Sequence, residues 1–152
     1  CYLRFGRLAV PLINDESTYS FEIGKGVELR KGKDITIIAT GLEVAESLEA
    51  AEKLAKDGID AQVINIHTIK PLDEKLVIEA AKKTGRVFTV EEHSIIGGLG
   101  SAIADCLCEN YPVKVTKLGI RDVFGESGPA KDLLHKYELD AEGIYNQIKN
   151  NM

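Results

Sequence analysis

A short apolar run followed by a helix-spaced apolar stripe recurs along most of the chain. Runs rich in β-branched residues predict buried strands at residues 35–39, 61–66, 87–90 and 113–118. After the first of them, Val44, Leu48 and Ala51 begin a stripe at helical spacing. Strands that alternate with single helices pair in parallel through right-handed crossovers. We therefore predict a three-layer α/β sandwich whose mostly parallel sheet has about five strands.

The strand pattern is weaker before the first of these runs. Two short segments there, 21–23 and 27–29, flank Gly24-Lys25-Gly26 and predict either a short hairpin or one edge strand. We expect residues 27–29 to form an antiparallel edge of the sheet. Residues 1–20 show little periodicity and open at a cysteine, so we interpret them as the tail of a preceding domain and a linker, with the domain itself at 21–152.

Composition narrows the class of function. The formal net charge is −5, with 19 Lys and Arg dispersed among 24 Asp and Glu, so no basic face for nucleic acid is expected. No apolar run approaches the ~20 residues of a spanning helix, so we expect no membrane partner. Three cysteines cannot all pair, which is typical of a reduced, cytoplasmic protein. The three histidines share no ligand spacing with the cysteines, so no metal site is predicted.

A glycine-rich turn at residues 97–101 (Gly-Gly-Leu-Gly-Ser) joins the third predicted strand to the next helix. Such a turn can present backbone N–H groups to an anion at a helix N-terminus. Its spacing, however, matches neither the dinucleotide fingerprint nor a P-loop. The favoured alternative is that the glycines let the backbone pass close to a neighbouring element. Anion binding stays open at this point.

Two further segments follow strands at the edge where α/β folds place ligands. His93 stands beside two glutamates and could do acid–base work, but no nucleophile accompanies it, so a structural or interface role is favoured and no catalytic residue is predicted. The loop at 119–129 carries Phe124, which could contact another chain or pack on its own domain. The candidate interface residues are His93, Gly97, Gly98 and Phe124.

Taken together, several segments resemble the C-terminal domain of transketolases. The similar segments are residues 2–7, 23–26, 34–41, 91–102 and 119–128, which cover essentially the whole chain in order. The Phe-Gly-Glu-Ser-Gly run beginning at Phe124 favours transketolase, and within it the second subunit of two-subunit enzymes. Deoxyxylulose-phosphate synthase and the beta subunit of 2-oxo-acid dehydrogenases share the domain and remain alternatives.

The resemblance implies a parent enzyme that moves two-carbon ketol units between sugar phosphates, in the pentose phosphate pathway, using thiamine diphosphate and Mg²⁺. The implied partners are a preceding pyrimidine-binding domain and a cofactor-binding domain or subunit, in a homodimeric parent. The Gly-Asp-Gly segment that holds the cofactor in this family is absent from this sequence, so we expect an assembly domain that binds no cofactor itself. Arg7, or less well Arg4, matches the arginine that grips the substrate phosphate, a task suited to its planar fork.

Two other functions stay open from the sequence. The chain could be an enzyme by itself, using His93 and its acidic neighbours, or an independent anion or nucleotide binder that uses the turn at residues 97–101.

Overall fold

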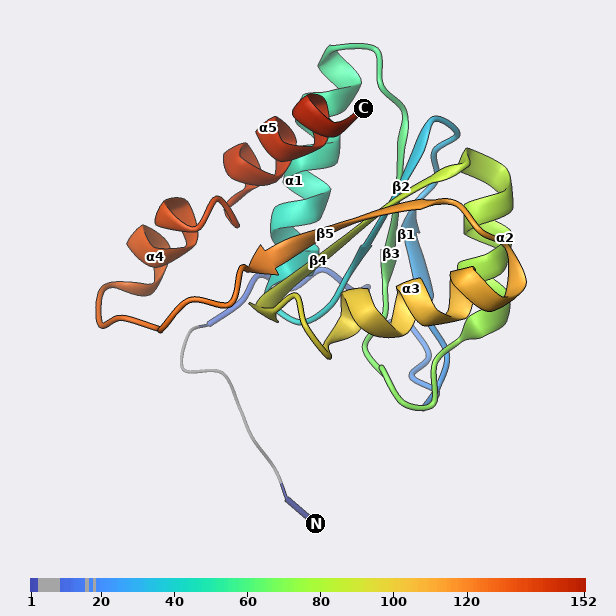
Figure 1. The fold of residues 1–152 in the computed structure, drawn as a ribbon, viewed down its shortest axis with the longest axis horizontal. Coiled ribbons are helices and arrows are strands. Elements are labelled where there is room, and N and C mark those ends of the chain that lie inside the picture. The colour runs from blue at the N-terminus through green and yellow to red at the C-terminus, as the bar shows by residue number, and fades with distance from the viewer. Residues whose placement is uncertain (3–8, 16, 18) are drawn as a thin grey trace.

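The computed structural model describes residues 1–2, 9–15, 17 and 19–152. Within them, five strands form one sheet at the centre of the molecule (Figure 1). They are β1 (Val27–Arg30), β2 (Ile35–Ala39), β3 (Ala61–Asn65), β4 (Arg86–Ser94) and β5 (Lys114–Ile120).

The strand order is β1-β3-β2-β4-β5, and every pair is parallel except β1 with β3. The mixed sheet with an antiparallel edge is therefore confirmed. Of the two segments near the N-terminal end only β1 is a strand. The amide of Lys25 donates to the carbonyl of Glu22 across 3.1 Å, so residues 22–25 form a turn. Residues 21–23 are not a strand, so the predicted hairpin does not form.

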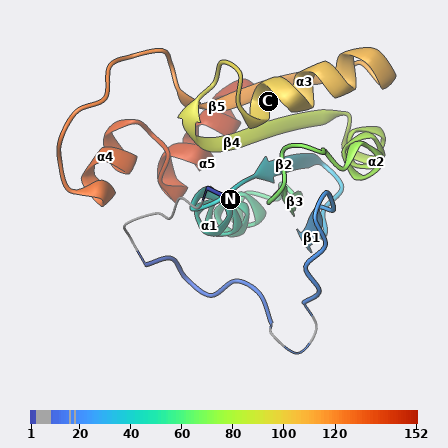
Figure 2. The ribbon, with the colours of Figure 1, turned by 90° about the horizontal axis from the view of Figure 1, so that it is seen from below.

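Helices cover both faces of the sheet (Figures 1 and 2). One face carries α1 (Glu43–Lys56) and α5 (Ala141–Asn151), and the other carries α2 (Glu74–Thr84) and α3 (Leu99–Asn110). The short α4 (Ala130–Lys136) lies beside the carboxyl end of β5, ahead of α5. This is the predicted three-layer sandwich.

Local sequence signals set several helix ends. The carboxylate of Asp73 accepts a hydrogen bond from the amide of Leu76, and Asp140 accepts one from the amide of Gly143. Each aspartate satisfies a backbone donor that the first helical turn leaves unpaired. Gly85 ends α2 with φ of 68°, a left-handed conformation that glycine adopts without steric cost.

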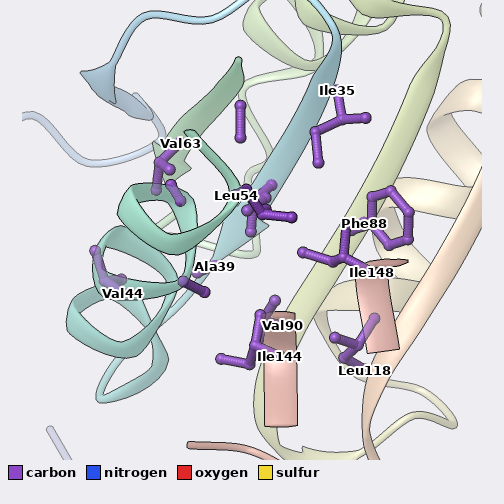
Figure 3. Packing of buried hydrophobic residues seen from close by; sticks show 14 of the residues in the cluster. Ile35, Ala39, Val44, Leu54, Val63, Phe88, Val90, Leu118, Ile144 and Ile148 are labelled. Carbon is purple, nitrogen blue, oxygen red and sulfur yellow. The ribbon is translucent and has the colours of Figure 1, made fainter. Parts of the chain in front are cut away.

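Two apolar clusters hold the layers together. The first lies between the sheet and α1 with α5, where Phe88, Leu54 and Ile148 are completely buried (Figure 3). The second lies under α2 and α3, around Ile38 and Leu107. The central strands β2 and β3 are buried at every position, as expected of parallel strands covered on both faces.

Successive strands are added first on one side of β2 and then on the other, so the strand order reverses next to β2. From β2 the chain crosses to β3 on one side, whereas β4 and β5 follow on the other side. The loops after β2 and β4 therefore diverge at the carboxyl edge of the sheet, which is where α/β folds place their ligands. We call this edge the switch-point edge.

Candidate functional site

Glu91 fills the glycine-rich turn on the switch-point edge. Its side chain is 1% exposed and points to the N-terminus of α3. Oε2 accepts the amide of Leu99 and Oε1 the amide of Gly100, each across 2.8 Å. These are backbone donors that a bound anion would use, and the positive end of the helix dipole favours the carboxylate there. An internal anion thus occupies the position where an external one would bind.

The approach of Glu91 explains Gly98, and the backbone conformation explains Gly97. A Cβ placed on Gly98 would lie 2.0 Å from the Glu91 Oε2, so any side chain there would displace the carboxylate. Gly97 has φ of 79°, and its amide donates to the hydroxyl of Ser101 across 2.9 Å. The close contact between Gly98 and Glu91 agrees with the explanation favoured from the sequence, in which the glycines let a neighbouring element approach closely.

A second buried glutamate begins α1 on the same edge. Glu43 is 0% exposed, and neither carboxylate oxygen has a hydrogen-bond partner among the described residues. Burial, together with the nearby Glu46, Glu92 and Asp140, raises the pKa of Glu43 to about 8. The carboxyl group is therefore mainly protonated at neutral pH in this domain.

Two grooves flank the first turn of α1. The first encloses about 270 Å³ between the ends of β4 and β5 and α4; its walls include Leu42, Glu92, Leu133 and Tyr137. The second, of about 400 Å³, lies between Leu42 and residues 10–14. Leu42 belongs to both walls, so the residue preceding Glu43 separates the two grooves.

The predicted interface residues all lie on or beside this edge. Phe124 is 101% exposed, so its ring does not pack against the described part of the chain. His93 and Gly97 are also exposed, and Gly98 is half-buried behind Glu91. An exposed aromatic ring suits a protein contact, since aromatic residues are enriched in such interfaces. The interface role of these residues stays a prediction.

The remaining site predictions can be placed only in part. Arg7 and Arg4 lie outside the described residues, so the phosphate contact stays a prediction. Among the described residues, no three His, Cys, Asp or Glu side chains are grouped so that they could hold a metal ion. In the same part of the chain, no helix is long and apolar enough to cross a membrane.

The sequence and the fold both have known relatives. Residues 24–144 match the family described as transketolase, C-terminal domain. This chain belongs to that family. A 6-deoxy-6-sulfo-D-fructose transketolase subunit of Clostridium sp. (strain MSTE9) is 50% identical over 143 residues, which are 94% of this chain and 44% of the relative. A 1-deoxy-D-xylulose-5-phosphate synthase of Geobacter sulfurreducens is 41% identical over 94% of this chain and 22% of its own length.

A solved structure, a split-gene transketolase described as an inactive beta4 tetramer, superposes on this transketolase C-terminal domain with a TM-score of 0.89 and 46% identity. The superposition covers 95% of this chain and 47% of that one. This domain thus spans about half the length of its split-transketolase relatives, and the close homologues include subunits of two-subunit enzymes.

Sequence reasoning missed the roles of Glu91 and Glu43, although signals for both were present. Glu91 directly continues the buried strand run that ends at Val90, which places a carboxylate just before a glycine turn. Glu43 precedes Ser47, Ala50 and Leu54 at spacings of one, two and three helical turns, all on the buried face of α1. A glutamate in the first turn of a helix is ordinarily attributed to the helix dipole, which hides such a position.

Proposed function

We propose that this chain is the C-terminal assembly domain of a thiamine-diphosphate-dependent transketolase of the two-subunit type. The supporting observation is that the Clostridium subunit and the split-gene transketolase are 50% and 46% identical to it and extend to about twice its length. The parent enzyme would transfer two-carbon ketol units between sugar phosphates, and this domain would position the parts that carry the cofactor.

The geometry of the switch-point edge supports an assembly role. The amides of Leu99 and Gly100 donate to Glu91 and that of Gly97 donates to Ser101, so the turn offers little to a phosphate or nucleotide. His93 is exposed, and its side chain makes no hydrogen bond within the described residues. A catalytic base is normally held by a second group that orients it. What the edge does offer is exposed apolar surface, at Ile96, Val123 and Phe124.

The partners follow from the same proposal. They are a preceding pyrimidine-binding domain and a cofactor-binding subunit, in a parent with two-fold symmetry, the commonest closed assembly. Thiamine diphosphate and Mg²⁺ would be held by those parts, and Arg7 would grip the substrate phosphate in the assembled enzyme. The C-terminal domain of deoxyxylulose-phosphate synthase is the second candidate, because the Geobacter synthase is 41% identical to this chain.

The isolated chain is expected to bind no thiamine diphosphate and to transfer no ketol unit, because the groups that hold the diphosphate belong to other domains. Isothermal titration of the purified chain with thiamine diphosphate and Mg²⁺ measures the first expectation, and a ketol-transfer assay on sugar phosphates measures the second. Saturable binding in the micromolar range, or turnover by the chain without a partner, would refute the proposed function.

A further inference from the structure

The burial of Glu43 leaves a strong acceptor without a donor. Its side chain has 0% exposed surface, and both oxygens lack a partner among the described residues. Buried polar groups are nearly always hydrogen-bonded, since leaving one unpaired costs free energy. The unpaired carboxyl group at the first turn of α1 therefore indicates a donor that comes from outside the described residues.

The surroundings of Glu43 select a cation as that donor. Three carboxylates act on it: Glu46 on the same helix, Glu92 at the end of β4, and Asp140 at the start of α5. Glu46 and Asp140 already accept hydrogen bonds from backbone amides. Glu92, by contrast, is exposed and has no hydrogen-bond partner within the described residues. The described side chains form no metal-binding group, which leaves a basic side chain as the cation that fits.

The first groove can accommodate such a side chain. Glu92 is on its wall, and the remaining wall is largely apolar, from Leu42, Leu133 and Leu139. Arginine and lysine lay their aliphatic stems along apolar surface while the charged head reaches an acid. Leu42 is half-buried, lines this groove and directly precedes Glu43 in the chain. Glu43 itself does not line the groove, so the inference requires the Leu42 side chain to move when the head group binds.

We propose that Glu43 receives an arginine or lysine side chain from the domain that precedes this one in the assembled enzyme. The inference rests on the proposed function, since it requires such a domain. The preceding domain is the source because residues 10–14 line the second groove together with Gly41 and Leu42. The segment that leads into the domain therefore runs beside Leu42, the residue that directly precedes Glu43.

The chemistry is tested on the purified chain with n-butylguanidinium as the probe and n-butanol as its uncharged control. NMR of the chain labelled at the glutamate carboxyl carbons reports each pKa, and the signal missing from Glu43→Gln identifies Glu43. At about pH 8 we expect saturable binding that is at least about fivefold weaker in Glu43→Gln, and a fall of about one unit or more in the pKa of Glu43 on saturation. Glu49→Gln removes an exposed acid of the same helix and should bind the probe like the wild type.

The source is tested by joining this chain to the preceding half of the Clostridium relative and measuring the pKa of Glu43 before and after adding that enzyme's other subunit. We expect the fall in pKa already in the joined protein. A fall that appears only with the other subunit would overturn the assignment to the preceding domain. No binding, equal binding in Glu43→Gln, or equal binding of n-butanol would overturn the inference. The proposed function would survive those results, since it fails only if the isolated chain binds thiamine diphosphate or turns over substrate.

Discussion

Replacing Glu91 by alanine is expected to lower the free energy of unfolding by about 3–5 kcal/mol, because hydrogen bonds to a charged acceptor contribute about 1.5–3 kcal/mol each and two would be lost. The amides of Leu99 and Gly100 would lose their acceptor at a buried helix end. Urea denaturation followed by circular dichroism measures the change, with the slope of the transition checked for two-state behaviour.

The neighbouring residue supplies the matched control. Glu92 carries the same side chain on the same strand but is exposed, so Glu92→Ala should change stability by no more than about 0.5 kcal/mol. Acetate should stabilise Glu91→Ala more than it stabilises the wild type, since a small carboxylate can bind the freed amides. Equal losses in the two variants would show that Glu91 does not hold the turn.

Replacing Glu43 by glutamine is expected to stabilise the domain at alkaline pH. Burial raises the pKa of Glu43 from 4.5 to about 8, so the folded chain keeps a proton that the unfolded chain releases. Stability falls with pH wherever the folded state binds more protons, so the wild type loses stability between about pH 4.5 and 8 and the loss levels off above that window. A pKa shift of this size corresponds to a loss of roughly 3–5 kcal/mol in the free energy of unfolding. Glu43→Gln would not show this loss, because glutamine has no carboxyl group to titrate.

Unfolding in urea at about pH 5 and about pH 9 measures this difference for both proteins. The wild type and Glu43→Gln should have similar stability at the lower pH and separate at the higher pH. The exposed Glu49→Gln, on the same helix, should follow the wild type at both. Parallel pH profiles for the wild type and Glu43→Gln would show that Glu43 is paired or hydrated in the folded domain.

The architecture was predictable because strands and helices here have distinct apolar periods. The β-branched run 35–39 and the stripe from Val44 each specify one element, and alternation of the two fixes a parallel sheet. Caps were predictable for the same local reason, as Asp73 and Asp140 show. The secondary structure of residues 21–23 could not be assigned from the sequence, because a short apolar pair between turn residues fits a strand and a loop equally well.

The chemistry of the switch-point edge was less predictable because it depends on contacts between distant elements. Anion binding at the glycine turn stays open from the sequence, and only the structure shows that the carboxylate of Glu91 accepts the amides of Leu99 and Gly100. Glu43 acquires its raised pKa partly from Glu92 and Asp140, which stand far from it along the chain. Such pairings are set by the tertiary fold, and no local period encodes them.

The most direct measurement of the assembly role is a domain replacement in the Clostridium relative, which is 50% identical to this chain over the matched region. Three proteins are compared, each mixed with that enzyme's other subunit and thiamine diphosphate: the intact relative, the relative without its matched region, and the relative carrying this chain in its place. Transketolase activity on 6-deoxy-6-sulfo-D-fructose should be lost in the shortened protein and restored by this chain. A replacement protein that folds and associates with the other subunit yet stays as inactive as the shortened one would contradict the account.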